Sequence, residues 1–386
     1  MARGALLSFL LLYGTLYAGF GAQSPYLPTL LQDRGLTAQA IGAVLAGGTA
    51  IRLVSGPLAG RFVDRFAAAK PVFAGCAAVA AVAGLGFLPA AGFLLLLAIA
   101  LCQAAALAPL APLADTLALG TAAGRTALRY GWIRGAGSAA FIAGSIVAGQ
   151  AVQDHGTDSI VWLAAALLIA AAIAARLVRP VPPHPTVSSA ATGGDIAALL
   201  RLPGFCRVVI VAALILGSHA LHDGFAVIRW RSAGIGADTA GLLWSESVAA
   251  EVVVFVVLGP ALVDRLGPAG AAAVAAGAGM LRWGVEGATA WLPAMVLIQP
   301  LHGLTFALLH LANMRLLAET VPPRLAATAL TLYGTVGIGA ASALLSLASG
   351  ALYGAIGPHA FWLMAGLCAL ALPLARGLSQ PSGAAT

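Results

Sequence analysis

The sequence contains few charged residues. Of its 386 residues, 9% are Asp, Glu, Lys or Arg, whereas 61% are hydrophobic. A soluble domain typically carries about 25% charged residues, and so small a supply cannot cover a water-facing surface. The composition therefore excludes a soluble globular protein, and we expect lipid to cover most of the molecule.

Cysteine and the motifs of catalysis are also scarce. The four cysteines are scattered through apolar runs without the spacing of metal ligands (Cys76, Cys102, Cys206 and Cys368), which favours small core residues. The sequence contains no nucleotide-binding loop, no nucleophile motif and no metal-ligand cluster, and it has no basic stripe or fold motif for nucleic acid. We therefore expect a protein that is not an enzyme and that needs neither a cofactor nor a nucleic-acid partner.

Long apolar runs make up most of the chain. A helix that crosses the roughly 30 Å hydrocarbon core needs about 20 apolar residues, and its backbone groups must be satisfied internally. At about 32 residues for a span and its loop, the chain accommodates twelve membrane helices. We expect them at 5–31, 38–62, 70–89, 92–118, 130–150, 159–178, 205–229, 238–262, 269–289, 291–318, 325–349 and 358–377.

One long polar break divides these spans six and six. Residues 179–201 are rich in proline and serine, a composition typical of a flexible linker. We predict an N-terminal six-helix half at 1–178, a cytoplasmic linker at 179–203 and a C-terminal six-helix half at 204–386. Two such halves, joined by a linker, describe the major facilitator fold, whose halves rock around a site near the bilayer midplane.

Lysine and arginine are distributed unevenly over the predicted loops. Positively charged loops of membrane proteins lie mostly in the cytoplasm. One set of loops holds Arg3, Arg61, Arg65, Lys70, Arg125, Arg129, Arg176, Arg179, Arg201, Arg265, Arg324 and Arg376. The opposite set holds only Arg34, Arg229 and Arg231. This asymmetry predicts a multi-pass protein of the bacterial inner membrane with both termini in the cytoplasm.

A short charged motif recurs in the two halves. Gly60-x-x-x-Asp64-Arg65 follows the second span, and Asp264-Arg265-x-Gly267 follows the eighth. The first copy resembles the major facilitator signature G-x-x-x-D-R-x-G-x-R-R, with Ala67 or Ala68 in place of the second glycine and Lys70 at the basic end. The resemblance implies that Asp64, Arg65, Asp264 and Arg265 lock the two halves together on the cytoplasmic side. An ordinary charged turn is the alternative.

Several ionisable residues lie within the predicted spans. Such a residue costs roughly 2.5–3.5 kcal/mol on insertion scales, so a functional role is the default hypothesis. The set comprises Arg52, Asp115, Arg134, His219, His222, Asp223, Glu246, Glu251, Arg282, Glu286, His302, His310 and Arg315. Asp115 and Arg134 have opposite charges at similar depth, so we expect them to pair, either as a gate or as a static structural pair.

The second half contains the candidates for proton coupling. A dehydrated carboxyl group such as that of Glu251 would hold a proton near neutral pH, and an arginine that moved close would release it. Arg282 is the nearest such arginine, although a local pair with Glu286 one turn away is the alternative. His302 and His310 can relay protons in the physiological range. We predict coupling by Glu251, Arg282, His302 and His310, against the alternative of paired or packing roles.

Polar and aromatic residues also share helix faces. At 100° per residue, Tyr13, Tyr17, Phe20 and Ser24 fall within about 60° of arc, and His302, Phe306, His310 and Asn313 within about 80°. His219 and Asp223 lie one turn apart on the seventh span. We predict a solute cavity lined by Tyr13, Tyr17, Ser24, His219, Asp223, Phe306 and Asn313, with ordinary core packing as the alternative. Such a wall would suit an aromatic or sugar-like solute.

Several longer runs carry a resemblance to a transporter family. They are Pro109-Leu-Ala-Pro-Leu-Ala-Asp115, Tyr130-Gly-Trp-Ile-Arg134 through Phe141, Gly224-Phe225, Leu243-Trp244-Ser245 through Glu251, Arg282-Trp283-Gly284, and His302 to Arg315. Over essentially its whole length the chain resembles the phenylpropionate permease family, within the group that includes lactose permease. Glu246, Glu286 and the pair His222-Asp223 are additions to that pattern.

The resemblance implies proton-coupled uptake of a small organic solute, such as an aromatic carboxylate, by alternating access. The proton gradient would drive transport, with no cofactor, and we expect the protein to function as a monomer in the lipid bilayer. Three alternatives remain open: a sugar or nucleoside proton symporter, a proton-driven efflux antiporter, and a non-transporting sensor or assembly partner. The fifth span lacks the G-x-x-x-G-P antiporter signature, which favours uptake.

Overall fold

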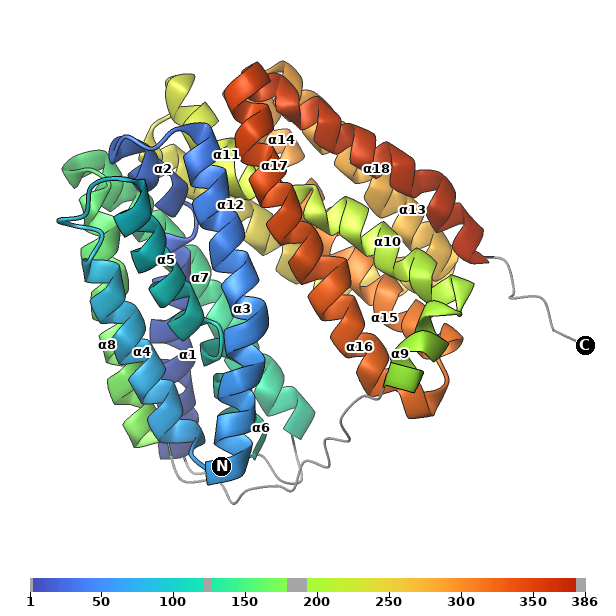
Figure 1. Ribbon diagram of the computed structural model, residues 1–386, viewed down its shortest axis with the longest axis horizontal. Coiled ribbons are helices and arrows are strands. Elements are labelled where there is room, and N and C mark those ends of the chain that lie inside the picture. Colours follow the sequence, from blue (N-terminus) through green and yellow to red (C-terminus); the bar gives the residue numbers. More distant parts are fainter. Residues whose placement is uncertain (1–2, 121–125, 179–192, 380–386) are drawn as a thin grey trace, which may run out of the picture. The chain divides into compact units, whose positions relative to one another are not determined.

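The computed structural model describes residues 3–120, 126–178 and 193–379, and all regular secondary structure in these ranges is helical (Figure 1). Within them, nine helical stretches are long and apolar enough to cross a membrane. Two of the nine, Ala237–Ala288 and Pro323–Arg376, have 52 and 54 residues, about twice the length that one span requires. The first bends at Gly267, and a helix of the second ends at Ile356, directly before Gly357; each of these glycines is followed by proline. Together with the shorter apolar helix Ala69–Leu85, these stretches match the twelve predicted spans.

The chain divides into two compact units. The described part of the first unit, Met1–Val187 with Trp230–Ser245, contains α1 (Arg3–Gln23), α2 (Leu27–Asp33), α3 (Ala38–Phe66), α4 (Ala69–Leu85), α5 (Phe93–Leu107), α6 (Leu110–Gly120), α7 (Thr126–His155), α8 (Asp158–Leu177), the end of α11 (His219–Ser232) and the start of α12 (Ala237–Val253).

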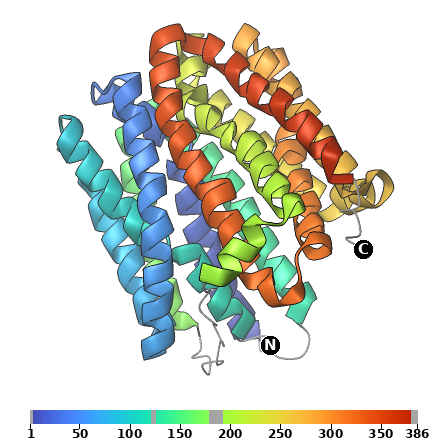
Figure 2. The same ribbon diagram turned by 45° about the vertical axis from the view of Figure 1, so that its right-hand side comes forward.

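The second unit, Ser188–Arg229 with Glu246–Thr386, holds the remaining parts of α11 and α12. Its other α-helices are α9 (Gly193–Leu200), α10 (Pro203–Gly217), α13 (Gly259–Ala288), α14 (Leu292–Ile298), α15 (Leu309–Thr320), α16 (Ala326–Leu332), α17 (Ala341–Ile356) and α18 (Ala360–Arg376). In Figure 2, α10 (yellow-green) lies between α17 (orange-red) and α18 (red). Three π-helical segments interrupt this unit: η1 (Val254–Leu258), η2 (Gly303–Leu308) and η4 (Tyr333–Ala340).

Some boundaries differ from the sequence-based expectation. The predicted span 5–31 is two helices, because the chain turns at Ser24–Tyr26 between α1 and α2. The predicted span 205–229 is divided between α10 and α11 at Ser218. Residues 179–192 of the predicted linker lie outside the described residues, and its later part forms α9, where Asp195 in the first turn complements the helix dipole.

Small residues allow α1 and α7 to cross closely in the first unit. A Cβ atom added to Gly21 would lie 2.1 Å from the Phe141 carbonyl oxygen, and one added to Gly144 would lie 2.2 Å from that of Ala18. At the same crossing, the Ser145 hydroxyl donates to the Gly21 carbonyl at 3.0 Å. Close backbone approach of this kind is how membrane helices gain packing energy without a hydrophobic driving force.

The segment Trp230–Ser245 is part of the first unit although it lies in the second half of the sequence. The buried Tyr26 hydroxyl donates to the Ala237 carbonyl at 2.9 Å, and the Gln153 side chain accepts from the Ala237 amide at 2.9 Å. Arg231 pairs with Asp33 at 3.3 Å. These contacts hold the segment between α11 and α12 against the ends of the first unit's helices.

Candidate functional site

Arg282 is the centre of a buried polar cluster in the second unit. This residue of α13 is fully buried. Its Nη1 lies 3.1 Å from Nδ1 of His302, while Nη2 lies 3.3 Å from Nε2 of His222 and donates to Oε1 of Gln299 at 2.9 Å. The guanidinium also lies 4.5 Å from the centre of the adjacent Trp283 ring, a distance at which the ring face attracts a cation.

The contacts of Arg282 determine which histidine nitrogens carry hydrogen. A guanidinium can only donate hydrogen bonds, so Nδ1 of His302 and Nε2 of His222 are both acceptors. In each neutral ring the hydrogen is therefore on the other nitrogen. Both of these nitrogens point at carboxylates: Nε2 of His302 lies 3.5 Å from Glu251, and Nδ1 of His222 lies 3.2 Å from both oxygens of Glu286.

The five residues form a chain in the order Glu251, His302, Arg282, His222, Glu286. Its two ends differ in access to water, because the Glu251 side chain is 25% exposed and the Glu286 side chain is fully buried. Among the described contacts, Glu286 binds His222 and forms no ion pair with Arg282. The local Arg282–Glu286 pair, one of the two sequence-based alternatives, is thus not formed.

Neutral polar residues support this cluster. Ser247 donates to Oε1 of Gln299 at 2.8 Å, so this oxygen accepts from both Ser247 and Arg282. His219 donates through Nδ1 to the Ile215 carbonyl at 3.1 Å, and its Nε2 lies 2.9 Å from the Thr305 hydroxyl. Gln299, Ser247 and Thr305 were not predicted from the sequence, because an uncharged residue in a membrane span has no comparable insertion cost.

The predicted stripe on the tenth span is only partly present. The π-helix η2 lies between His302 and His310, and its i→i+5 turns contain more residues than those of an α-helix, which rotates the later residues away. Phe306 stacks on His302 with ring centres 5.5 Å apart. His310 instead contacts Phe255 edge-on at 5.8 Å, and the buried Asn313 donates to the Tyr333 hydroxyl at 3.2 Å.

Two predicted residues lie apart from the cluster. Among the described contacts, His310 makes no hydrogen bond to it. Asp223 is exposed on α11, while its neighbour His222 is buried. Glu246, which the sequence left unexplained, is partly buried on α12 and makes no hydrogen bond to another described residue.

A second polar group lies in the first unit, where two tyrosines separate the expected ion pair. Tyr13 donates to Asp115 at 2.6 Å, and Arg134 binds the Tyr17 hydroxyl. The two tyrosine rings stack with centres 5.7 Å apart, and Phe20 lies edge-on to Tyr17 at 5.6 Å. Among the described contacts Asp115 and Arg134 do not pair directly, because each charge is satisfied by a tyrosine of α1.

The aromatic side chains of α1 thus contact one another, but much of their surface is buried. Tyr13 is fully buried, so it contributes to the core of the first unit as well as to the Asp115 site. Ser24 lies beyond the end of α1, exposed in the turn before α2. The structure therefore brings Tyr13, Tyr17 and Phe20 together and leaves Ser24 apart.

The repeated charged motif has different partners in the two units. Asp264 pairs with Arg315 at 2.6 Å, and Arg315 also binds Glu319 at 3.2 Å, all on exposed side chains. No described residue hydrogen-bonds the Asp64 side chain, and Arg65 lies over the Phe66 ring at 5.5 Å. Three residues after each aspartate the backbone has positive φ, 50° at Ala67 and 69° at Gly267. This shared geometry explains why the signature carries glycine there.

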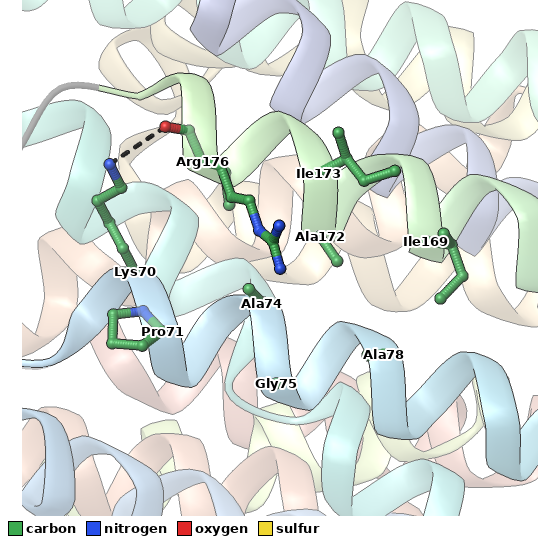
Figure 3. A pocket seen from close by; sticks show the side chains of 10 residues that line it. Lys70, Pro71, Ala74, Gly75, Ala78, Ile169, Ala172, Ile173 and Arg176 are labelled. Atoms are coloured by element: carbon green, nitrogen blue, oxygen red, sulfur yellow. Dashed lines mark hydrogen bonds between the residues drawn. The ribbon is translucent and has the colours of Figure 1, made fainter.

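A groove of about 650 Å³ lies between α4 and α8 in the first unit (Figure 3). Apart from Lys70 and Arg176 at one end, its lining consists of small or apolar residues: Pro71, Ala74, Gly75, Ala78, Ile169, Ala172, Ile173 and Ala175. The Lys70 amine already donates to the carbonyls of Arg176 and Val178. Because a solute site needs several convergent polar groups, we take the Arg282 cluster of the second unit and the Asp115–Arg134 group of the first unit as two separate candidate sites.

Comparison with known proteins agrees with this architecture. The model of a family described as MFS_1 like family matches residues 6–364. The chain is 33% identical to a "Probable 3-phenylpropionic acid transporter" of Escherichia coli (strain K12), over 96% of this chain and 97% of that protein. It is 25% identical to the "Maltose permease" of Geobacillus stearothermophilus, over 89% and 86% of the two chains.

A solved structure of a mutant nucleoside transporter NupG superposes with a TM-score of 0.87, covering 97% of this chain and 100% of that one. At 18% identity this likeness shows the fold alone. The fold is thus the twelve-helix major facilitator fold, and the relatives are transporters, not enzymes. The chain belongs to the MFS_1 like family and is a multi-pass membrane transporter of the major facilitator type.

Proposed function

We propose that this transporter takes up a small aromatic carboxylate together with a proton. The observation that carries the proposal is the position of Arg282 between two histidines whose remaining nitrogens face carboxylates. The name of the Escherichia coli relative, which refers to 3-phenylpropionic acid, supports the substrate class. Transport would follow alternating access of a site near the bilayer midplane.

Protonation of the cluster is linked to the position of Arg282. A doubly protonated imidazole has hydrogen on both nitrogens, so its Nδ1 can no longer accept from a guanidinium. When His302 takes up a proton, the 3.1 Å contact between its Nδ1 and Arg282 must break. A proton can therefore move an arginine, which is the step that coupling requires.

The charge balance of the cluster favours one proton. With both histidines neutral, the carboxylates of Glu251 and Glu286 and the guanidinium of Arg282 leave one net negative charge. A proton that enters at the partly exposed Glu251 cancels it. A neutral cluster is less costly in a low-dielectric environment than a charged one, so the loaded form is the one suited to a conformational change.

The coupling role of Glu251 can be tested by Glu251→Gln in reconstituted vesicles. The amide cannot release a proton, so we expect uphill accumulation of 3-phenylpropionate to disappear while counterflow exchange continues. Glu319→Gln is the matched control, because Glu319 is exposed and binds only Arg315 among the described contacts. Undiminished uphill accumulation in the Glu251 variant would reject the proposed role.

Direction and substrate class need separate measurements. In everted vesicles, proton-driven accumulation would indicate efflux and contradict uptake. A thermal-shift screen of the purified protein against aromatic acids, sugars and nucleosides tests the class of solute. We expect the aromatic acids alone to raise the unfolding temperature, since ligands that bind only the folded state stabilise it.

A further inference from the structure

Arg52 lies at the middle of a long helix of the first half. The helix α3 extends from Ala38 to Phe66, so fourteen residues separate Arg52 from either end. At 1.5 Å per residue that is about 21 Å, whereas the hydrocarbon core extends about 15 Å from its centre. An arginine side chain reaches the membrane interface only from near a helix end, so Arg52 is too deep to escape the membrane in this way.

Between Gly48 and Ala59, the face of α3 that carries Arg52 consists of small and polar residues. At 100° per residue, Gly48, Thr49, Ser55, Gly56 and Ala59 fall within about 60° of it. Among the exposed large apolar side chains of this helix, Val54 and Leu58, which lie within two turns of Arg52, point about 120–160° away from it, whereas Phe62 and Phe66 near the C-terminal end lie about 80° and 40° from it. Residues that face lipid are mostly large and apolar, so at the level of Arg52 this face is not the lipid-facing side of α3.

Among the described residues, neither Arg52 nor its neighbour Ser55 has a partner for its side-chain polar groups. Arg52 is exposed, and no hydrogen bond, ion pair or ring contact joins it to another described residue. One turn along the same face, the Ser55 hydroxyl is buried and lacks a hydrogen-bond partner. A charged residue at mid-membrane depth almost always faces a water-filled cavity or a partner. Here the described residues provide a cation, Arg52, and a hydroxyl donor, Ser55, but no anion that pairs with them.

We propose that Arg52 binds the carboxylate of the transported solute, with the Ser55 hydroxyl as a second donor. A guanidinium offers two parallel N–H groups that match the two oxygens of a carboxylate. By contrast, Arg282, Arg134 and Arg315 already contact side chains of the protein. The inference rests on the proposed function, because it identifies the residue that would select an acid over a neutral solute.

The test compares an acid with its uncharged isostere. Affinities of purified protein for 3-phenylpropionate and for 3-phenylpropanamide are measured by calorimetry in the wild type, Arg52→Gln, Arg52→Lys and Arg61→Gln. Charge-assisted hydrogen bonds are worth enough to predict an about 10- to 100-fold loss of acid affinity in Arg52→Gln, with little change for the amide. Arg52→Lys keeps the charge and should retain part of the preference.

Arg61→Gln is the matched control, since Arg61 is an exposed arginine near the end of the same helix. Its ratio of acid to amide affinity should equal that of the wild type. If Arg52→Gln lowers both affinities by the same factor, Arg52 acts on the conformation of the protein and the inference is overturned. If Arg52→Gln does not fold, an unchanged ratio in Arg52→Lys overturns it instead. Wild-type protein that binds neither compound would contradict the proposed substrate class itself, which is a different result.

Discussion

Nη1 of Arg282 lies 3.1 Å from Nδ1 of His302, and this contact places the hydrogen of the imidazole on the nitrogen that faces Glu251. On the other side of the guanidinium, His222 is oriented in the same way toward Glu286. One arginine thus controls the protonation geometry of two histidine–carboxylate pairs. The following variants test this arrangement and the packing that holds it.

Arg282→Lys should uncouple transport from the proton gradient. A lysine ammonium is a compact point charge and cannot reproduce a planar fork that binds His302, His222 and Gln299 together. We expect uptake to lose its dependence on an imposed pH gradient, measured with labelled solute in vesicles. Arg324→Lys is the control, because Arg324 is exposed in the same unit and has no place in the cluster. Full pH-gradient dependence in Arg282→Lys would contradict the role of the guanidinium.

His222→Ala should destabilise the second unit strongly. Removal of one partner of a buried pair leaves the other unpaired, which typically costs about 3–5 kcal/mol, and Glu286 is fully buried. In the double variant His222→Ala with Glu286→Gln the uncompensated charge is absent, so part of the stability should return. Thermal unfolding in detergent measures both changes. A double variant that is less stable than the single one would show that the pair is not the source of the cost.

Ala67→Gly should stabilise the protein. Ala67 adopts the left-handed conformation, with φ 50° and ψ 37°, which costs a residue with a side chain roughly 1–2 kcal/mol relative to glycine. The expected gain in unfolding free energy is about 1 kcal/mol, since glycine also gains flexibility in the unfolded chain. Ala68→Gly, at φ −112°, has no such strain to relieve and should be neutral or destabilising.

Gly267→Ala tests the equivalent position of the second unit. Its backbone lies at φ 69° and ψ 162°, a region that is essentially restricted to glycine. We expect a loss of about 1–3 kcal/mol, seen as a lower unfolding temperature. An unfolding temperature equal to that of the wild type would mean that the turn before Pro268 is not held in this conformation.

Gly144→Ala should disrupt the crossing of α1 and α7. The added methyl group would lie 2.2 Å from the backbone oxygen of Ala18, so the two helices must move apart. Gly135→Ala on the same helix is the matched control, because an added Cβ meets no atom within 4 Å and alanine favours the helix by about 1 kcal/mol. Opposite shifts in unfolding temperature are expected for the two variants.

The sequence predicted the membrane spans well because apolar length is a strong and local signal. The interruptions at Ser24–Tyr26 and Ser218 were missed, since in both cases the apolar run continues past the break. The charged residues of the site were predicted because a charge within a membrane span has a high insertion cost. Their partners were not, because pairing depends on which helices meet.

Particular contacts show the limits of helix periodicity. Asp115 and Arg134 were expected to pair. Instead, the hydroxyl of Tyr13 binds Asp115 and the hydroxyl of Tyr17 binds Arg134, and the two tyrosine rings stack on each other. The stripe on the tenth span assumed a regular 100° step, which the π-helix η2 does not keep. Glu286 could be recognised in the sequence as a buried acid, whereas its hydrogen bond to His222 depends on how the chain brings these two side chains together.

The packing of Trp230–Ser245 within the first unit has a consequence for how the protein can be divided. A gene cut within the linker would produce a first polypeptide in which the Tyr26 hydroxyl and the Gln153 amide lack Ala237, and Asp33 lacks Arg231. The covalent halves are therefore not independent modules. Each fragment should be degraded when made alone, and a split transporter should accumulate only when both fragments are synthesised in the same cell.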